Sequence, residues 1–331
     1  MQERPHKRGG FIRLTFSLIL LVLAVALFIG RQQVIDRVMV WRYQPNAMVQ
    51  SLVEKSHMSP EGQFYFYASR PEINDREPFN KNCTSSGEQT VVLGCYAAQR
   101  IYIFDVTDQR LNGIKEVTAA HEMLHAAYDR LGQGEKERVD ALIETQLKSV
   151  TDKRIQALIA VYARTEPGER LNELHSIFAT ELVTVTPELE AYYAQYFNDR
   201  AAVAVLSQQY EKVFSSLNQQ QDALVTELNT LADSISARTQ AYNRDTEQLN
   251  QDVDSFNNRA NSGGYTTQAS FDAGRNELLA RQTQLAATRD LISADIKIYN
   301  QKRSDLEAIN GQAAQLNQNI NSNALDPAAS I

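Results

Sequence analysis

The sequence is poor in cysteine, in histidine and in clusters of basic residues. Its 331 residues include 2 cysteines and 5 histidines, and the net charge is −7. A nucleic-acid surface needs clustered Lys and Arg, and no basic run occurs beyond residue 13. The phosphate-binding loops GxxxxGK[ST] and GxGxxG are also absent. These absences argue against nucleic-acid binding and against nucleotide chemistry.

Proline is absent between Pro187 and Pro327, and apolar residues recur there every seven positions. Two such runs flank the glycine-containing segment Asn261–Gly264, and sustained heptads are typical of coiled coils. We therefore predict a long antiparallel α-helical coiled-coil hairpin over residues 201–322, with its tip near 261–267. The open alternative is that each arm packs against a coiled-coil partner protein or a second copy of the chain.

Polar residues replace apolar ones at core positions towards the proposed tip. Folding the chain back about the glycines places Arg238 near Asp295, and Arg281 near Asp245 or Asp252. Such buried pairs fix register at a cost in stability. In the alternative arrangement these polar layers are merely solvated.

Residues 14–30 form an uncharged and almost wholly apolar run, at the short end of what spans a membrane. Basic residues ahead of the run favour a cytoplasmic N-terminus. We predict a cytoplasmic tail at 1–13, a transmembrane signal-anchor at 14–30 and a cell-membrane protein whose remaining chain is extracytoplasmic. A cleaved signal peptide is the alternative, although the apolar run continues past the cleavage-like Ala24–Ala26.

The two cysteines, Cys83 and Cys95, flank a turn-rich segment followed by a β-branched run. A disulfide closing this loop is sterically reasonable, and it agrees with an oxidising compartment. Two free buried thiols are the alternative.

Residues 31–200 show strand-like runs followed by helical ones. The strand-like runs are Gln63–Tyr67, Thr90–Leu93 and Arg100–Val106, and a helical pattern extends from Ile114 to about Tyr196. Strands followed by helices predict an α+β domain. Residues 323–331 are predicted to be a disordered tail.

The stretch AAHEMLHAAY places His121, Glu122 and His125 on one uninterrupted helix. Histidines at i and i+4 lie on one face, where their ring nitrogens suit a tetrahedral zinc ion. The glutamate at i+1 then lies beside the metal-bound water and can take its proton. Uncharged neighbours such as Met123 and Leu124 fit a buried site. The pattern predicts a Zn²⁺ hydrolase site, with two histidines on an ordinary helix as the alternative.

A third metal ligand must come from another segment. The sequence NELHS at 172–176 resembles the thermolysin-type NExxS pattern, and ELHSI at 173–177 resembles the ELRTF segment of clostridial neurotoxin proteases. With the HExxH motif, these residues resemble gluzincin zinc metallopeptidases. The resemblance implies a minimal zincin-like metallopeptidase domain with a small antiparallel sheet, metal ligands His121, His125 and Glu173, and Glu122 as general base. It departs where thermolysin-like enzymes carry an aspartate, because Ile177 occupies that position.

Other residues near the proposed third ligand remain candidates for roles in the site. Glu181 is the alternative ligand, and His175 is a second-shell or substrate-orienting candidate. A phenol from Tyr192, Tyr193 or Tyr196 can stabilise a tetrahedral intermediate, although aromatics at helical spacing commonly form core.

The combined prediction is a membrane-anchored extracytoplasmic zinc metallopeptidase that acts on a peptide or protein substrate. One rival is a non-enzymatic envelope scaffold with a structural or vestigial zinc site. The other is a zinc amidase that acts on cell-wall peptides, since HExxH does not specify the substrate pocket.

Overall fold

The computed structural model describes residues 30–83, 92–165 and 167–322. They divide into two compact units, one comprising the chain up to Val213 together with the chain from Leu316 onwards, and the other Phe214–Gln315. The predicted cytoplasmic tail, the signal-anchor apart from Gly30, and the C-terminal tail lie outside the described residues. Within the described ranges, no helix is both long and apolar enough to cross a membrane.

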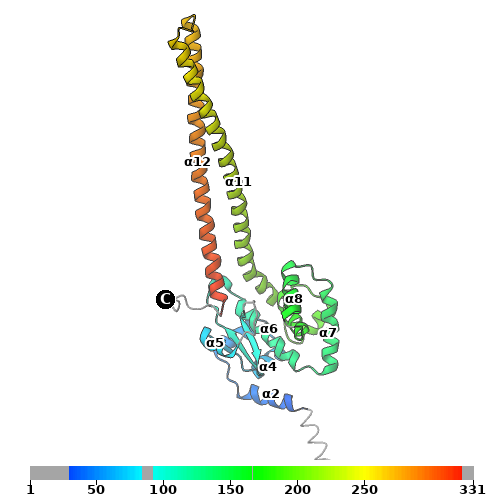
Figure 1. The fold of residues 1–331 in the computed structure, drawn as a ribbon. Helices are drawn as coiled ribbons and strands as arrows, with labels where there is room; N and C mark the ends of the chain where they lie inside the picture. Colours follow the sequence, from blue (N-terminus) through cyan, green and yellow to red (C-terminus); the bar gives the residue numbers. More distant parts are fainter. Residues whose placement is uncertain (1–29, 84–91, 166, 323–331) are drawn as a thin grey trace, which may run out of the picture. The chain divides into compact units, whose positions relative to one another are not determined.

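The first unit is built mainly from short helices around a small sheet (Figure 1). In chain order its elements are α2 (Arg31–Arg42), α3 (Ala47–Lys55), α4 (Pro60–Ala68), β1 (Glu72–Asn74), α5 (Arg76–Asn82), β2 (Gly94–Ala97), β3 (Arg100–Phe104), the 3-10 turn η1 (Gln109–Leu111), α6 (Ile114–Asp129), α7 (Gln133–Leu147), α8 (Lys153–Thr165), α9 (Arg170–Glu181), α10 (Pro187–Tyr193) and the start of α11 (Arg200–Asn261).

The predicted fold class is wrong. Of the described residues, 77% are helical and three short strands form one sheet, so this part of the chain is mostly α rather than an α+β zincin-like domain. The sheet is also mixed rather than antiparallel. Its order is β1-β3-β2, with β1 parallel and β2 antiparallel to β3.

The largest single cause of this error is the aromatic run Gln63–Tyr67, which lies in helix α4. Its β-like composition is overridden by a strong helix start, because Ser59 accepts a hydrogen bond from the backbone N–H of Gly62 and Pro60 occupies the first turn. Phe66 is then fully buried. Local capping and tertiary burial together outweigh the strand propensity of the side chains.

Helix α6 is the central helix of the first unit. It contacts β2 and β3 of the sheet as well as α3, α4 and α9 (Figure 1). Small and apolar residues make this possible, since Ala119, Ala120, Met123 and Leu124 are completely buried. The helix starts at Gly113, whose φ of 96° is in the left-handed region that favours glycine. The HExxH segment is thus surrounded on several sides by fixed structure.

Cys83 and Cys95 form a disulfide that links the end of α5 to strand β2. Their Cα atoms are 5.9 Å apart, within the normal range for a disulfide. Part of the predicted strand Thr90–Leu93 lies outside the described residues. The strand that follows it, β2, starts at Gly94.

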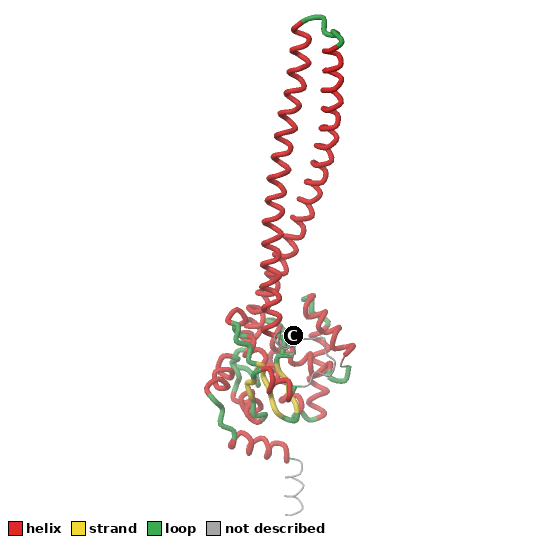
Figure 2. The backbone as a smooth tube through the Cα atoms, turned by 60° about the vertical axis from the view of Figure 1, so that its left-hand side comes forward, coloured by secondary structure: helices red, strands yellow, loops and turns green. Residues whose placement is uncertain are grey.

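The second unit consists of the rest of α11 and most of α12 (Gln268–Ile320), which run antiparallel side by side (Figure 2). Gly263 adopts a φ of 69° in the loop between them. The rings of Phe256, Tyr265 and Phe271 pack against one another next to this loop, in tilted and edge-to-face arrangements. The aromatic cluster and the left-handed glycine together close the hairpin.

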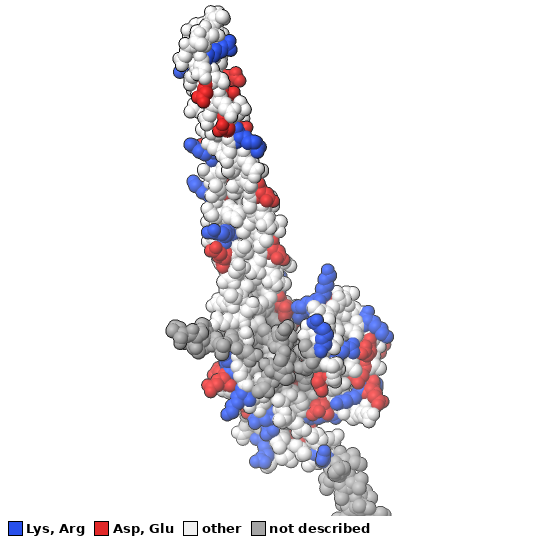
Figure 3. Space-filling view, in the orientation of Figure 1, with Lys and Arg blue, Asp and Glu red and all other residues white. Residues whose placement is uncertain are grey.

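Two ion pairs join the arms of the hairpin. Arg238 Nη1 donates to Asp295 Oδ2 at 2.5 Å, and Arg281 Nη1 donates to Asp252 Oδ2 at 2.5 Å. The first pairing is the one predicted from the heptad register, and the second is one of the two partners, Asp245 or Asp252, predicted for Arg281. On the face shown in Figure 3, acidic and basic side chains are interspersed along this unit.

Candidate metal centre

Helix α6 presents His121 and His125 on the face that packs against α9. The two ring centroids are 4.7 Å apart and the rings are steeply inclined, at 72°. Both side chains are largely buried, with 19% of His121 and 10% of His125 exposed. The i, i+4 spacing therefore produces the expected stacking on one face of the helix.

Glu173 in the first turn of α9 faces both imidazoles. Its Oε2 atom lies 3.6 Å from His121 Nε2, and its Oε1 atom lies 3.5 Å from His125 Nε2. One ligand atom from each of the three residues falls within 4.8 Å of the others, so the group could hold a metal ion. Two ligands of a tetrahedral zinc, each about 2.0 Å from the metal, lie roughly 3.3 Å apart. The two carboxylate–imidazole distances, 3.6 and 3.5 Å, are close to that value.

The carboxylate itself fits a cation. Glu173 Oε2 is buried and has no hydrogen-bond partner among the described residues, and such an atom is costly unless a positive group satisfies it. Burial raises the pKa of Glu173, but the facing His125 and His121 imidazoles and the Tyr162 hydroxyl lower it, and the net pKa is below its ordinary value. Glu173 is therefore ionised at neutral pH and ready to bind a cation.

Asn172 determines which nitrogen of His125 faces the group. His125 Nδ1 lies 2.9 Å from Asn172 Oδ1, and the Asn172 amide donates to Glu169 at 3.1 Å. Because that amide nitrogen is used as a donor, Oδ1 is the acceptor and His125 Nδ1 carries the proton. The lone pair is then on Nε2, which faces Glu173. This is the arrangement in which metal-binding histidines are held by an outer hydrogen bond.

Glu122 of α6 packs against strand β2. It is 5% exposed, and Gly94 makes room for it: a Cβ atom at position 94 would lie 2.8 Å from Glu122 Oε1 and 2.6 Å from Thr118 Cγ2. The strand therefore approaches the helix so closely that only glycine fits. The close approach of β2 thus restricts the position of the Glu122 carboxylate, which follows His121 in the sequence.

His175 does not join the metal group. It is completely buried, its Nε2 lies 3.1 Å from the Tyr192 hydroxyl, and its ring is surrounded by Tyr128, Tyr192, Tyr193 and Tyr196. Burial lowers the pKa of His175 to about 3, so it is neutral.

The three candidate phenols belong to the same aromatic cluster. The Tyr193 hydroxyl donates to the His175 carbonyl at 2.7 Å, and the Tyr192 and Tyr196 hydroxyls are 3.3 Å apart. Burial raises the pKa of Tyr196 to about 12. The hydroxyls of Tyr192, Tyr193 and Tyr196 therefore make their hydrogen-bond contacts inside the core.

Glu181 also lies apart from the metal group. Its Oε2 atom is 2.7 Å from Arg154 Nη2, and the same arginine reaches Glu211 at 3.7 Å. The carboxylate is thus held in an ion pair at the far end of α9. Of the two candidate third ligands, the structure brings Glu173 and not Glu181 to the histidines.

Three contributors to the site were not assigned roles from the sequence. Asn172 is visible in the sequence only as part of the NELHS motif, although its position next to Glu173 is a usable signal. Tyr162 of α8 and Gly94 of β2 carry no local signal, because their roles depend on how α8 and β2 pack. Strand β3 is central in the sheet, and β2, which lies near Glu122, is one of its two edges.

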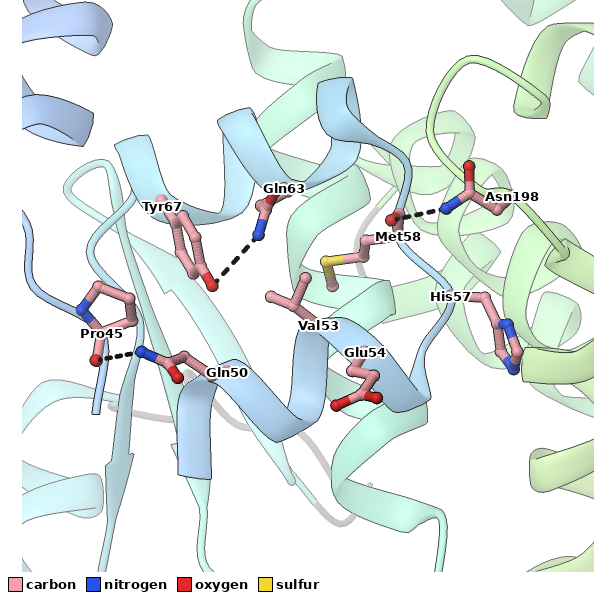
Figure 4. A pocket seen from close by; sticks show the side chains of 9 residues that line it. All are labelled: Pro45, Gln50, Val53, Glu54, His57, Met58, Gln63, Tyr67 and Asn198. Atoms are coloured by element: carbon pink, nitrogen blue, oxygen red, sulfur yellow. Dashed lines mark hydrogen bonds between the residues drawn. The ribbon is translucent and has the colours of Figure 1, made fainter. Parts of the chain in front are cut away.

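A pocket of about 590 Å³ lies between α3 and α4 (Figure 4). Glu54, His57 and Tyr67 contribute to its wall, and none of the metal-group residues lines it. The pocket is therefore separate from the candidate metal centre.

Comparisons with protein-family models, with curated proteins and with solved structures found no match. The function of this chain is therefore inferred from the geometry of the metal group itself. The residues that carry it are His121, His125, Glu173, Asn172 and Glu122.

Proposed function

We propose that this protein is a membrane-anchored, extracytoplasmic zinc metallopeptidase. The observation that carries the proposal is the convergence of His121, His125 and Glu173, with Asn172 holding His125 in the metal-binding tautomer. Two imidazole nitrogens and one carboxylate are a donor set that zinc prefers, and three protein ligands leave a position open for water. The ligand set is that of gluzincin peptidases.

Zinc held there would lower the pKa of a water molecule and polarise the substrate carbonyl. Glu122 accepts a proton from the attacking water as the new C–O bond forms. It then delivers that proton to the amide nitrogen as the C–N bond breaks, which releases a carboxylic acid and an amine. Burial of Glu122 against Gly94 holds its carboxylate in place for both transfers.

An extended peptide fits the neighbourhood of Glu122. Among the described strands, β2 has a neighbour on one side only, and a peptide can add to such an edge by backbone hydrogen bonding. This supports a peptide substrate over a substrate without a peptide backbone. The apolar run at 14–30 supports an anchor, and the disulfide Cys83–Cys95 supports an oxidising compartment.

Metal content tests the ligand set. The full chain should bind about one zinc per molecule, Glu173→Ala should lose it, and Glu181→Gln should keep it as the matched control on the same helix. Zinc in Glu173→Ala and none in Glu181→Gln would show that the ligand assignment is wrong. A wild-type chain that binds no zinc would contradict the proposal.

A comparison of protein termini in cells tests the activity. New termini should appear with wild type and with Glu116→Gln, an α6 carboxylate control, and should be absent with Glu122→Gln, which keeps the metal. General-base removal costs about 10²–10⁴-fold in rate. A wild type that binds zinc but yields no new protein termini contradicts peptidase activity. If wild type and Glu122→Gln cells then differ in their cell-wall peptides, the zinc amidase is favoured.

A scaffold function is the second candidate, and the helical hairpin favours it. Leu291, Ile296 and Ile298 on α12 are 57%, 43% and 48% exposed. These side chains are available to a coiled-coil partner protein or a second copy. If deletion of the gene causes a phenotype, and wild type and Glu122→Gln restore the normal state equally well, this candidate is favoured.

A further inference from the structure

Helix α2 buries its acidic side chain and exposes apolar ones. Asp36 is 3% exposed and accepts a hydrogen bond from Gln32, whereas Val34, Val38 and Trp41 are 48%, 42% and 85% exposed. The three apolar residues follow an i, i+4, i+7 spacing and so form one stripe. Surface helices of globular proteins normally have the opposite orientation.

A buried ion pair holds α2 in this orientation. Arg130, just after α6, donates to both carboxylate oxygens of Asp36 at 2.9 Å. The same guanidinium donates to the Tyr96 hydroxyl at 3.0 Å and to the Ala126 carbonyl at 2.8 Å. Rotating α2 to bury its apolar stripe would leave Arg130 and Asp36 unpaired, which is strongly unfavourable. The exposed stripe is therefore a fixed surface.

The charges on α2 specify what covers the stripe. Arg31, Arg37 and Arg42 are exposed, and Asp36, the helix's acidic residue, is turned inwards to Arg130. A helix with exposed arginines around Val, Ile and Trp side chains fits the surface of an anionic bilayer, where Trp favours the headgroup level. Each arginine near such a surface strengthens binding roughly fivefold.

Two further observations favour lipid over a second copy of the chain. Helix α2 follows directly after the apolar run 14–30, so an anchor there would deliver it to the bilayer surface. A symmetric pair of α2 stripes would instead bring Arg37 and Arg42 of one copy close to those of the other, and like charges oppose such packing.

We infer that α2 lies on the surface of an anionic membrane, with its Val34–Val38–Trp41 stripe inserted and Trp41 at the headgroup level. The inference rests on the anchoring part of the proposed function and is independent of hydrolysis. Through the Asp36–Arg130 pair it would attach the C-terminal end of α6 to the membrane-bound helix. His125 is then about 8 Å along α6 from Arg130, at 1.5 Å per residue.

Trp41 is the one tryptophan in the sequence, so intrinsic tryptophan fluorescence reports on this stripe alone. The full chain is reconstituted into vesicles of phosphatidylglycerol and phosphatidylcholine. Emission should move to shorter wavelength than in unfolded protein, acrylamide quenching should fall severalfold, and lipids brominated near the headgroup should quench it. A Trp41 that stays accessible to acrylamide and is not quenched by brominated lipid overturns the inference.

The charge requirement is tested by Arg37→Gln with Arg42→Gln. This pair should restore acrylamide quenching of Trp41 towards that of a water-exposed side chain. Lys148→Gln with Arg164→Gln removes two positive charges from exposed positions elsewhere and should leave Trp41 shielded. Equal effects of the two pairs would show that net charge alone, rather than α2, is responsible.

Resistance of the protein to carbonate extraction separates this inference from the anchor. An extracted protein means that the anchor itself fails, and the inference fails with it. A resistant protein with exposed Trp41 keeps the anchor and rejects only the membrane-bound α2. A Trp41 that is shielded from acrylamide but not quenched by brominated lipid indicates a protein occupant and also rejects the inference.

Discussion

His125 Nδ1 and Asn172 Oδ1 are 2.9 Å apart, and this contact links the HExxH helix to the residue that immediately precedes Glu173. One hydrogen bond thus sets the tautomer of one candidate ligand and the position of another. The contact joins the two helices at the metal group, so the ligands on α6 and α9 are positioned together.

Asn172→Leu should weaken zinc binding by about 10–100-fold, the usual effect of losing an outer hydrogen bond to a metal-binding histidine. Competition with a chromophoric chelator measures the affinity. Glu169→Gln is the control, because it changes only the side chain that accepts a hydrogen bond from Asn172 Nδ2 and leaves the His125–Asn172 contact in place. An affinity unchanged by Asn172→Leu would show that His125 does not need this bond.

Gly94→Ala should damage the site by placing a methyl group against Glu122 and Thr118. The atoms at 2.6 and 2.8 Å from the new Cβ must move, and forced overpacking of this kind costs about 1–3 kcal/mol. Thermal unfolding should show the loss of stability, and hydrolysis should fall more than zinc content does, because Glu122 is displaced while the ligands remain. Gly134→Ala is the control, since nothing lies within 4 Å of that position. A fully active Gly94→Ala protein would contradict the tight approach of β2 to α6.

Features that depend on local spacing were predictable from the sequence. The heptads predicted the Arg238–Asp295 pair, and Asp252 as one of two possible partners of Arg281, because each arm keeps its period up to a loop marked by glycine. The i, i+4 histidines likewise meet on one face because a helix places them there.

Features that depend on packing between distant segments were not predictable. Strand β1 has three residues, which is too short to produce a periodic signal, and it forms only because β3 pairs with it. The role of Gly94 exists only because β2 lies over Glu122. His175 looked like a site residue because of its type and its position next to the metal-ligand candidate. Helix α9 instead points the His175 side chain towards a core lined by tyrosines, and the packing of α10 against α9 sets this direction.

The buried neutral His175 should make the metal-free protein sensitive to acid. Its folded pKa is about 3 against an ordinary value of 6.5, so the unfolded chain binds the extra proton between these pH values. The stability that the neutral ring contributes is fully present above pH 6.5 and is lost as pH falls towards 3, with a slope of up to about 1.4 kcal/mol per pH unit.

Urea unfolding of chelator-treated protein between pH 7.5 and 5 measures this slope. His175→Phe should flatten it, even though the substitution lowers stability at neutral pH by removing the bond to Tyr192. His57→Phe, an exposed histidine, is the control and should keep the slope. Equal slopes for wild type and His175→Phe would assign the acid sensitivity to another group.

Arg200 should be the main support for the end of α9. Its guanidinium is 1% exposed and donates to the carbonyls of Ala179, Leu182 and Val183, at 3.0, 2.5 and 2.8 Å. It also pairs with Glu190 at 2.6 Å. These carbonyls belong to the last turn of α9 and the loop after it, where a helix leaves its acceptors unsatisfied. One arginine therefore replaces a C-terminal cap for the helix that carries Glu173.

Arg200→Met keeps most of the side-chain volume but leaves several buried acceptors without a donor. Each such group costs about 1–3 kcal/mol, so denaturant unfolding should show a loss of at least 3 kcal/mol. Because α9 also carries Glu173, added zinc should recover part of that stability by binding only the folded state. Arg164→Met, at an exposed position on α8, is the matched control and should change stability by less than about 0.5 kcal/mol. An Arg200→Met protein as stable as the control would mean that α9 ends without help from this guanidinium. A destabilised protein that zinc does not rescue would mean instead that the end of α9 and the metal group are energetically independent.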